Sequence, residues 1–327
     1  MKVLQACTRA LRLRLLGQPA PIAVTMALTY RCTQRCGYCR IWEAAGTELD
    51  TAQVLNTIDQ LCAIGMSRLG LTGGEPLLRN DLDAIVSHAR SKGLFTTVFT
   101  AGALVPERLG TLRKLDAVLV SLDGPQAVHD AQRGAGAYDQ ALRAIRLLRD
   151  VGVPVWTNTV ITAQSLDAVQ HVLDLAEEYD LHCAFQPVFR HSYSVSEAAV
   201  SRLSADGRDY RALIDQLIHL RCQGAPILSS VAALEALRDQ APGPRDCLAG
   251  RAYAAVTPNG HVAPCQVMLQ APDLPDGLAL GFAEAFRRAQ RPQGCRCSCF
   301  VTVEADLLFS LDPTTVASTL RHALRKG

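Results

Sequence analysis

The stretch CTQRCGYC, residues 32–39, follows the first β-rich run of the chain, which extends from Ile22 to Leu28. It places Cys32, Cys36 and Cys39 in a CxxxCxxC pattern within one short loop. Three thiolates from such a loop suit one corner each of an iron-sulfur cube and leave the fourth iron without a protein ligand. An iron with an open position can bind a substrate or a cofactor, so we expect the chemistry to lie beside this loop.

A zinc site is the alternative for these three cysteines. Zinc in a structural site takes four ligands, mostly Cys or His. The nearest further candidates are Cys62 and His88, and both lie in segments that we predict to be helical. The spacing and the missing fourth ligand therefore favour an iron-sulfur cluster.

Short β-rich runs alternate with amphipathic stretches from about Pro21 to Pro187, which is typical of the βαβ units of a parallel sheet. We predict strands at residues 22–28, 68–71, 95–100, 117–121, 153–162 and 183–188. The helices between them are predicted at residues 50–65, 81–92, 106–114, 138–150 and 165–179. Asp50 and Gln53 have the spacing of a capping box, and Gly65 is expected to end the first of these helices.

The octapeptide CTQRCGYC resembles the signature of the radical S-adenosylmethionine (SAM) superfamily, in which an aromatic residue, here Tyr38, precedes the last cysteine. The resemblance covers about residues 22–190 and implies an α/β fold, a partial (β/α)6 barrel. It also implies a 4Fe-4S cluster whose open iron chelates the amino and carboxylate groups of SAM. An electron from the cluster, supplied by a donor such as flavodoxin or ferredoxin, then cleaves SAM to a 5′-deoxyadenosyl radical that abstracts hydrogen from the substrate.

Polar residues follow the other predicted strands, where the chemistry of a β/α barrel collects. Gly73, Gly74 and Glu75 follow the second strand, where glycines permit close backbone approach and a carboxylate can accept from an ammonium group. They resemble the family's GGE motif, which implies a contact with the methionyl amine of SAM. Thr100 and Gly102 follow the third strand, where the family often has a polar turn.

Ser121 and Asp123 end the fourth predicted strand. A hydroxyl and a carboxylate at alternate positions can bind the diol of a ribose, and a helix cap or an Asx-turn is the alternative. Arg133 can pair with a carboxylate, and the resemblance makes this the carboxylate of SAM. Asn158, in the fifth strand, matches a position of family contacts with ribose or adenine.

A second group of cysteines lies near the C-terminal end, and it comprises Cys247, Cys265, Cys295, Cys297 and Cys299. A hairpin predicted over residues 253–264, with its turn at Asn259 and Gly260, brings the cysteines that flank it close together. Four of the five can enclose a second cluster. A zinc site is the alternative here, because four cysteines suit zinc equally well on spacing alone.

The same region resembles the C-terminal extension of SPASM and twitch radical SAM enzymes, whose first element is a pair of cysteines separated by a spacer, a glycine and four further residues. Cys247, Gly260 and Cys265 match that element. The final run CRCSC, residues 295–299, is shorter than that of a full SPASM domain, which favours the twitch form with one auxiliary 4Fe-4S cluster. The implied ligands are Cys247, Cys265, Cys295 and one or both of Cys297 and Cys299.

Composition excludes several classes of protein. The chain has 327 residues, of which 49% are hydrophobic, and its 12 cysteines are too few for a disulfide scaffold. Its 33 basic and 31 acidic residues leave a formal charge of +2, which argues against a nucleic-acid partner. No stretch approaches the ~18 apolar residues of a membrane span, and the N-terminus lacks the apolar core of a signal peptide. We therefore expect a cytoplasmic protein.

We divide the chain into four parts. Residues 1–20 are a basic helix, residues 21–190 the partial barrel, residues 191–240 a helical connection, and residues 241–327 the auxiliary-cluster domain with a C-terminal helix over 314–325. Between residue 244 and that last helix we expect loops and short strands.

Three functions fit these features. The first is a radical SAM enzyme acting on a small molecule such as a sugar, an aminocyclitol or a cofactor precursor, with the auxiliary cluster assisting electron transfer or substrate binding. The alternative is a maturase that crosslinks, epimerises or forms a thioether in a ribosomally made peptide. Such maturases often carry a leader-binding domain of about 80 residues, and only about 20 residues precede the first strand here, which favours the small molecule. A non-enzymatic metal-binding adaptor is the third, but it would not need the SAM-binding residues.

Overall fold

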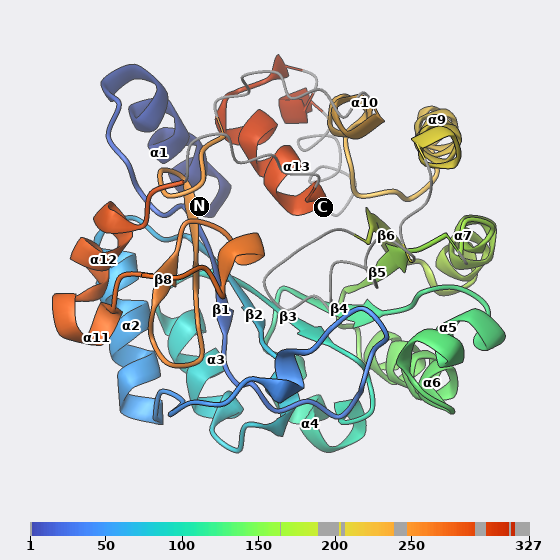
Figure 1. Ribbon diagram of the computed structural model, residues 1–327, viewed down its shortest axis with the longest axis horizontal. Helices are drawn as coiled ribbons and strands as arrows, with labels where there is room; N and C mark the ends of the chain where they lie inside the picture. The colour runs from blue at the N-terminus through green and yellow to red at the C-terminus, as the bar shows by residue number, and fades with distance from the viewer. Residues whose placement is uncertain are drawn as a thin grey trace.

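The fold centres on a single eight-stranded sheet in the order β6-β5-β4-β3-β2-β1-β7-β8 (Figure 1). The structure is a computed structural model, which describes residues 2–163, 165–188, 203, 207–238, 247–291, 299–313 and 315–317. The strands are β1 (Ala23–Ala27), β2 (Arg68–Thr72), β3 (Phe95–Thr100), β4 (Ala117–Ser121), β5 (Val155–Ile161), β6 (His182–Pro187), β7 (Tyr253–Val256) and β8 (Val262–Ala263). Only β8 is antiparallel to its neighbour. The predicted α/β fold with six parallel β/α units is confirmed, and the sheet stays open.

Helices cover one face of this sheet. Those that alternate with the strands are α2 (Thr51–Ala63), α3 (Leu82–Ser91), α4 (Val105–Leu112), α5 (Gln126–Arg133), α6 (Ala137–Asp150) and α7 (Ala168–Tyr179). Burial alternates along the strands: Leu69 and Leu71 of β2 are buried in the main core, whereas Arg68, Gly70 and Thr72 are half-buried on the opposite face. The second face is therefore the one that remains partly open for a ligand.

The local signals at α2 act as the sequence predicts. Asp50 accepts from the Gln53 N–H at 2.8 Å, and the Gln53 side chain accepts from the Asp50 N–H at 2.9 Å. This capping box satisfies two backbone donors at the start of the helix. Gly65 follows the end of α2 with φ 121°, a conformation that favours glycine.

The hairpin predicted over residues 253–264 is present as β7 and β8. Its first strand lies in parallel beside β1, so the C-terminal part of the chain continues the same sheet. Helix α12 (Phe282–Arg288) contacts α2 and buries Phe282 and Phe286 in the main core. This part of the chain and the N-terminal β/α units therefore share one core.

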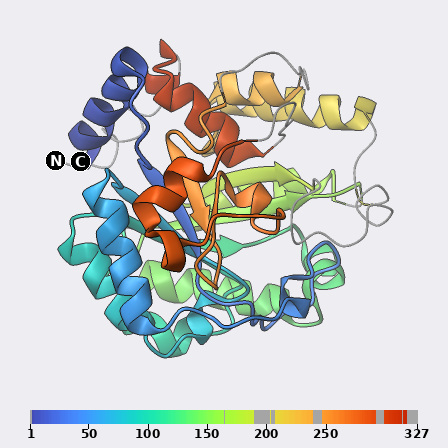
Figure 2. The same ribbon diagram turned by 60° about the vertical axis from the view of Figure 1, so that its left-hand side comes forward.

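Four further helices lie in the upper part of Figure 1: α1 (Lys2–Leu16), α9 (Gly207–Cys222), α10 (Val231–Arg238) and α13 (Phe300–Phe309). The short helix α11 (Gly277–Leu280) lies beside α12. Helix α1 lies within the segment where the sequence predicts a basic helix, and it lies beside α13, as Figure 2 shows. Helix α13 also contacts α10.

The expectation of loops and short strands after residue 244 is wrong for α12 and α13. Phe282, Ala285 and Phe286 of α12 have the i, i+3, i+4 spacing of an amphipathic helix, and that signal was available in the sequence. Helix α13 is apolar on nearly all sides, so it has no face to distinguish it from a strand. The predicted helix over 314–325 lies largely outside the described residues, as does the stretch 241–246.

None of the helices in the described ranges is both long and apolar enough to cross a membrane.

Candidate functional site

The first cysteine loop lies where β1 ends, at the edge of the sheet where the parallel strands finish. Cys32, Cys36 and Cys39 are reduced and half-buried. The Cys39 N–H donates to the Cys36 carbonyl at 3.1 Å, and the Gly37 N–H donates to the Gln132 carbonyl at 2.9 Å. The second bond fastens the loop to the end of α5, a helix from a different β/α unit.

The donor set of this loop fits an iron-sulfur cluster. Burial raises the pKa of all three thiols, to about 11 for Cys39, and a bound metal displaces their protons because the thiolate is the ligand. Among the described residues no three His, Cys, Asp or Glu side chains are grouped closely enough to share a single ion. A cube takes each thiolate on a separate iron, so three thiols from one loop suit it.

The GGE segment is bonded directly to the backbone that leads into the cysteine loop. The Gly74 N–H donates to the Thr29 carbonyl and the Glu75 N–H to the Arg31 carbonyl, each at 2.8 Å. A Cβ on Gly74 would overlap the Arg31 carbonyl. The two glycines are therefore required by the close approach of two backbones, one residue before Cys32.

The Glu75 carboxylate is buried and faces the end of β3. It accepts from the Leu77 N–H at 3.1 Å, from the Thr100 hydroxyl at 3.0 Å and from the Ala101 N–H at 2.8 Å. Burial raises the pKa of Glu75, and the backbone donors of Ala101 and Leu77 oppose that shift. The structure thus brings Glu75 and Thr100 together, and their hydrogen bond joins the loops that follow β2 and β3.

Asp123 and Arg133 form a buried ion pair that reaches the cysteine loop. Arg133 Nε lies 2.6 Å from Asp123 Oδ2, and its Nη2 lies 3.2 Å from Oδ1. The Tyr38 hydroxyl donates to the same carboxylate at 3.0 Å. Asp123 also accepts from the Val160 N–H at 2.9 Å, so its side chain makes neither a helix cap nor an Asx-turn.

Ser121 and Asn158 are available to a ligand. They are paired in register on β4 and β5, and both are half-buried on the open face of the sheet. In the described part of the chain neither side chain makes a hydrogen bond. A hydroxyl and an amide placed side by side can bind a ribose diol or an adenine edge.

Of the second cysteine group, the structure describes Cys247, Cys265 and Cys299, whereas Cys295 and Cys297 lie outside the described residues. Cys265 and Cys299 are buried. The Gln266 side-chain amide donates to the Cys299 sulfur at 3.2 Å. The structure therefore places Cys299, at the start of α13, near the segment that follows Cys265.

Asp306 of α13 connects that helix to Cys247. It accepts from the Leu248 N–H at 2.7 Å and from the Tyr253 hydroxyl at 2.8 Å, and the Cys247 sulfur lies 3.3 Å from the same hydroxyl. Burial raises the pKa of Asp306 to about 6. Sequence reasoning missed this carboxylate, although an acid within the apolar run FVTVEADLLF was a visible signal.

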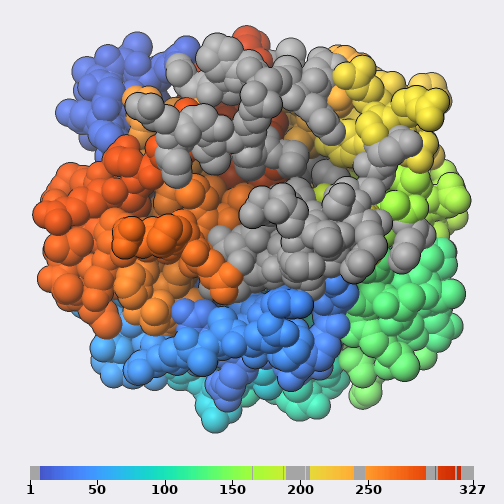
Figure 3. All heavy atoms as spheres, in the orientation of Figure 1, coloured from blue at the N-terminus to red at the C-terminus, as the bar shows by residue number. Residues whose placement is uncertain are grey.

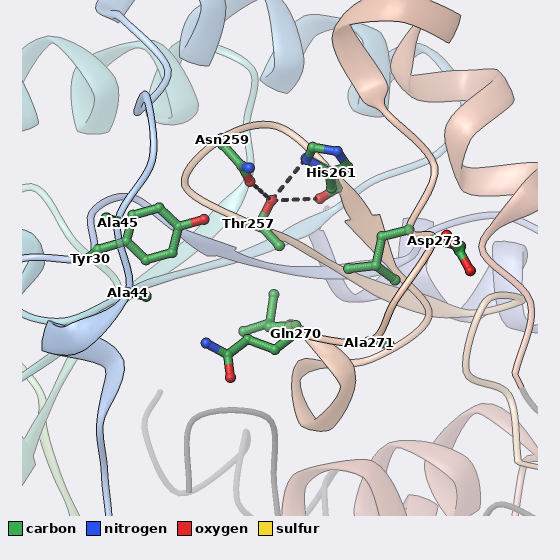
Figure 4. Close-up of a pocket in the computed structure, with 11 residues that line it drawn as sticks. Tyr30, Ala44, Ala45, Thr257, Asn259, His261, Gln270, Ala271 and Asp273 are labelled. Carbon is green, nitrogen blue, oxygen red and sulfur yellow. Dashed lines mark hydrogen bonds between the residues drawn. The ribbon is translucent and has the colours of Figure 1, made fainter.

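A cavity of about 620 Å³ lies beside the first cysteine loop. It is bounded by the segment after β1, the turn between β7 and β8, and the segment 269–274. Figure 3 shows the N-terminal part of the chain, in blue, in direct contact with the C-terminal part, in orange. The lining residues are Tyr30, Ala44, Ala45, Thr257, Asn259, His261, Leu269, Gln270, Ala271, Asp273 and Leu274. Figure 4 shows the Tyr30 ring projecting into this space toward Thr257. Sequence reasoning did not find this pocket, because it forms between segments more than 200 residues apart.

The sequence of the chain is similar to those of known proteins. The profile of the radical SAM superfamily matches residues 26–176. A PqqA peptide cyclase from Rhodopseudomonas palustris is 28% identical, over 94% of this chain and 89% of its own length.

Two solved structures share the fold. Streptococcus suis SuiB bound to S-adenosylmethionine has a TM-score of 0.70 at 17% identity, covering 87% of this chain and 69% of SuiB. SuiB bound to the precursor peptide SuiA has a TM-score of 0.68 at 17% identity, covering 90% of this chain and 73% of SuiB.

Proposed function

Because residues 26–176 form a radical SAM domain, we propose that this radical SAM enzyme modifies a peptide and forms an intramolecular crosslink in it. The proposal is carried by the similarity to a PqqA peptide cyclase, which extends over 94% of the chain and so includes the C-terminal hairpin and α12. SuiB, which has a similar fold, has been solved with a precursor peptide. A peptide substrate therefore has more support than the small molecule favoured by the sequence.

The 4Fe-4S cluster and SAM, when bound, supply a 5′-deoxyadenosyl radical. An electron donor such as flavodoxin or ferredoxin is part of this proposal. We assign the binding of SAM to the edge of the sheet beside Cys32. The GGE backbone, which Glu75 and Thr100 hold in place, would bind the methionyl amine there. Ser121 and Asn158 would bind the ribose and the adenine.

A crosslink between two carbon atoms breaks two C–H bonds and forms one C–C bond. One hydrogen atom goes to the 5′-deoxyadenosyl radical, the other leaves as a proton, and one electron remains to be accepted. We propose that an auxiliary 4Fe-4S cluster at Cys247, Cys265 and Cys299, with Cys295 or Cys297, accepts that electron. The buried positions of Cys265 and Cys299 support this site, because a low-dielectric shell shields a cluster from water.

The cavity beside Tyr30 is the place that we propose for a side chain of the peptide. Its volume of about 620 Å³ lies within the usual range of ligand pockets. Its lining combines apolar groups such as Leu269 and Leu274 with polar groups such as Asn259 and Gln270. In the described part of the chain the Tyr30 hydroxyl makes no hydrogen bond, so it can donate to a ligand.

The test is an anaerobic incubation of the reconstituted enzyme with SAM, dithionite and the short peptides encoded beside its gene. Mass spectrometry should show a peptide that has lost two hydrogen atoms, together with 5′-deoxyadenosine. The Cys36→Ala variant should form neither product. The opposite outcome is that all peptides stay unchanged while 5′-deoxyadenosine and a modified sugar or cofactor precursor are formed. That result would contradict the peptide substrate and favour the small-molecule function.

The pocket can be tested in the same assay. Ala271→Trp should lower peptide turnover at least tenfold, because the indole fills the cavity. Ala279→Trp on α11 is the matched control, since Ala279 is exposed and does not line the cavity. Equal turnover by the two variants would place the peptide elsewhere.

The auxiliary cluster has its own test. Iron and sulfide analysis of the reconstituted protein should show two clusters, and a Cys247→Ala/Cys265→Ala variant should retain one. A protein that holds a single cluster before and after this change has no auxiliary site.

A further inference from the structure

Arg133 is a buried cation whose three guanidinium nitrogens all face polar groups inside the protein. Only 8% of the residue is exposed. Two nitrogens are bound by Asp123, as described above. The third, Nη1, lies 3.3 Å from Gln34 Oε1 and 3.9 Å from the sulfur of Cys36. The charge of Arg133 is therefore directed at one of the three cysteines of the first loop.

Asp123 holds this cation in place from the opposite side. The carboxylate is fully buried, and the Tyr38 hydroxyl and the Val160 N–H fix both of its oxygens. The Tyr38 ring also lies against the guanidinium, whose carbon is 5.7 Å from the ring centre. Arg133 thus cannot withdraw from Cys36 without breaking its contacts with Asp123 and with the cysteine loop itself.

The contact is specific to Cys36. Gln34, which accepts from Arg133, also accepts from the Cys36 thiol at 3.7 Å. Among the hydrogen bonds of the described residues, Cys32 and Cys39 receive none from an arginine side chain. Hydrogen bonds to cluster sulfurs and nearby charge set the reduction potential of an iron-sulfur cluster, because they stabilise the negative charge that reduction adds.

We propose that Arg133, held by Asp123 and Tyr38, is a positioning residue that donates its Nη1 hydrogen to the Cys36 sulfur and raises the reduction potential of the cluster at this loop. The inference rests on the cluster of the radical SAM domain and is independent of the peptide substrate. In this proposal Arg133 affects the reduction potential of the cluster even when SAM is absent. If Arg133 served only to bind the SAM carboxylate, its replacement would leave the potential of the SAM-free cluster unchanged.

The experiment is a redox titration of the reconstituted protein without SAM or peptide. The reduced cluster at the first loop is monitored by electron paramagnetic resonance, through the signal that is missing in the Cys36→Ala variant. Arg133→Gln should make the equilibrium constant for one-electron reduction about tenfold smaller, which is a shift of about 59 mV to lower potential. An Arg133→Gln/Asp123→Asn variant should show the same shift. This second variant avoids an unpaired buried carboxylate, which alone can unfold a protein.

Arg79→Gln is the matched control. Arg79 is also buried, at 7% exposure, and forms a two-point ion pair with Asp81 at 2.8 and 2.6 Å, but it touches no cysteine. Its loss should lower the unfolding temperature without changing the reduction potential. The unfolding temperature of each variant without iron separates general stability from the effect on the cluster.

Each outcome decides the proposal. A lower potential in both Arg133 variants, or loss of iron from both while Arg79→Gln loads fully, supports it. A fully loaded Arg133 variant with unchanged potential overturns it, and so does equal loss of iron in Arg79→Gln. An unchanged potential combined with at least tenfold weaker SAM binding would instead make Arg133 a ligand of the SAM carboxylate.

Discussion

At the scale of single residues, Gly74 joins the GGE turn to the backbone that leads into the cysteine loop. Its backbone donates to the Thr29 carbonyl, and its Cα faces the Arg31 carbonyl. Neither neighbour is the end of a flexible side chain, so neither can move aside cheaply. A side chain as small as a methyl group must therefore displace the backbone next to Cys32.

Gly74→Ala should destabilise the protein by about 1–3 kcal/mol, the usual cost of overpacking, and should lower the iron content after reconstitution. Thermal unfolding of the iron-free protein and iron analysis measure the two effects. Gly110→Ala is the control, because a Cβ at this exposed position of α4 meets nothing within 4 Å. Alanine is also the better helix former by up to about 1 kcal/mol, so G110A should unfold no earlier than the wild type. Full iron loading of G74A would contradict the close approach.

At the scale of elements, α5 has a buried face that is polar. His129, Gln132 and Arg133 are its buried residues. The sequence therefore shows no apolar periodicity at this helix, which is why it was not predicted. His129 Nδ1 accepts from the Asp123 N–H at 3.0 Å, so the imidazole fixes the backbone of the residue that binds Arg133.

This contact predicts a pH dependence of stability. Burial, with repulsion from Arg133, lowers the pKa of His129 from 6.5 to about 4. Between these values the unfolded chain binds a proton that the folded chain does not, so the free energy of unfolding falls as the pH falls. The contribution of one proton is at most about 1.4 kcal/mol per pH unit.

His129→Asn should flatten this dependence, because the amide oxygen can accept from the Asp123 N–H but does not titrate. The measurement is the unfolding temperature of both proteins from about pH 7 to about pH 4.5, a range that covers most of the interval between the two pKa values. His219→Asn, at an exposed position of α9, should keep the wild-type slope. Identical slopes for H129N and the wild type would show that His129 does not control acid stability.

At the scale of the whole molecule, the C-terminal part completes the sheet. β7 pairs with four residues of β1, from Ala23 to Met26. Val256, Phe282 and Phe286 lie in the same core as the N-terminal β/α units. The two parts of the chain thus bury their apolar surface against each other.

A fragment that ends at Arg238 should therefore lack the cooperative unfolding transition of the full chain. Without β7, β1 becomes an edge strand, and the core loses the aromatic side chains of α12. Circular dichroism on heating and limited proteolysis measure this. Removal of residues 1–16 is the control, because α1 buries only Ala10 and Leu13 among its described side chains, and this fragment should still unfold cooperatively. A cooperative fragment ending at Arg238 would mean that the core folds independently.

The sequence by itself determined the order of the six β/α units, the caps of α2 and the hairpin at Gly260, because these depend on interactions between residues near one another in the chain. It also predicts which cysteines hold the first cluster, since their spacing confines them to one loop. Only the tertiary structure decided which side chains these groups face. Arg133 and Cys36 are 97 residues apart and Asp306 and Tyr253 are 53 apart, and no local pattern encodes such pairs. The sheet fixes these pairs, because it brings the ends of distant strands to one edge. A buried charged side chain can then bind only the polar groups that lie next to it there.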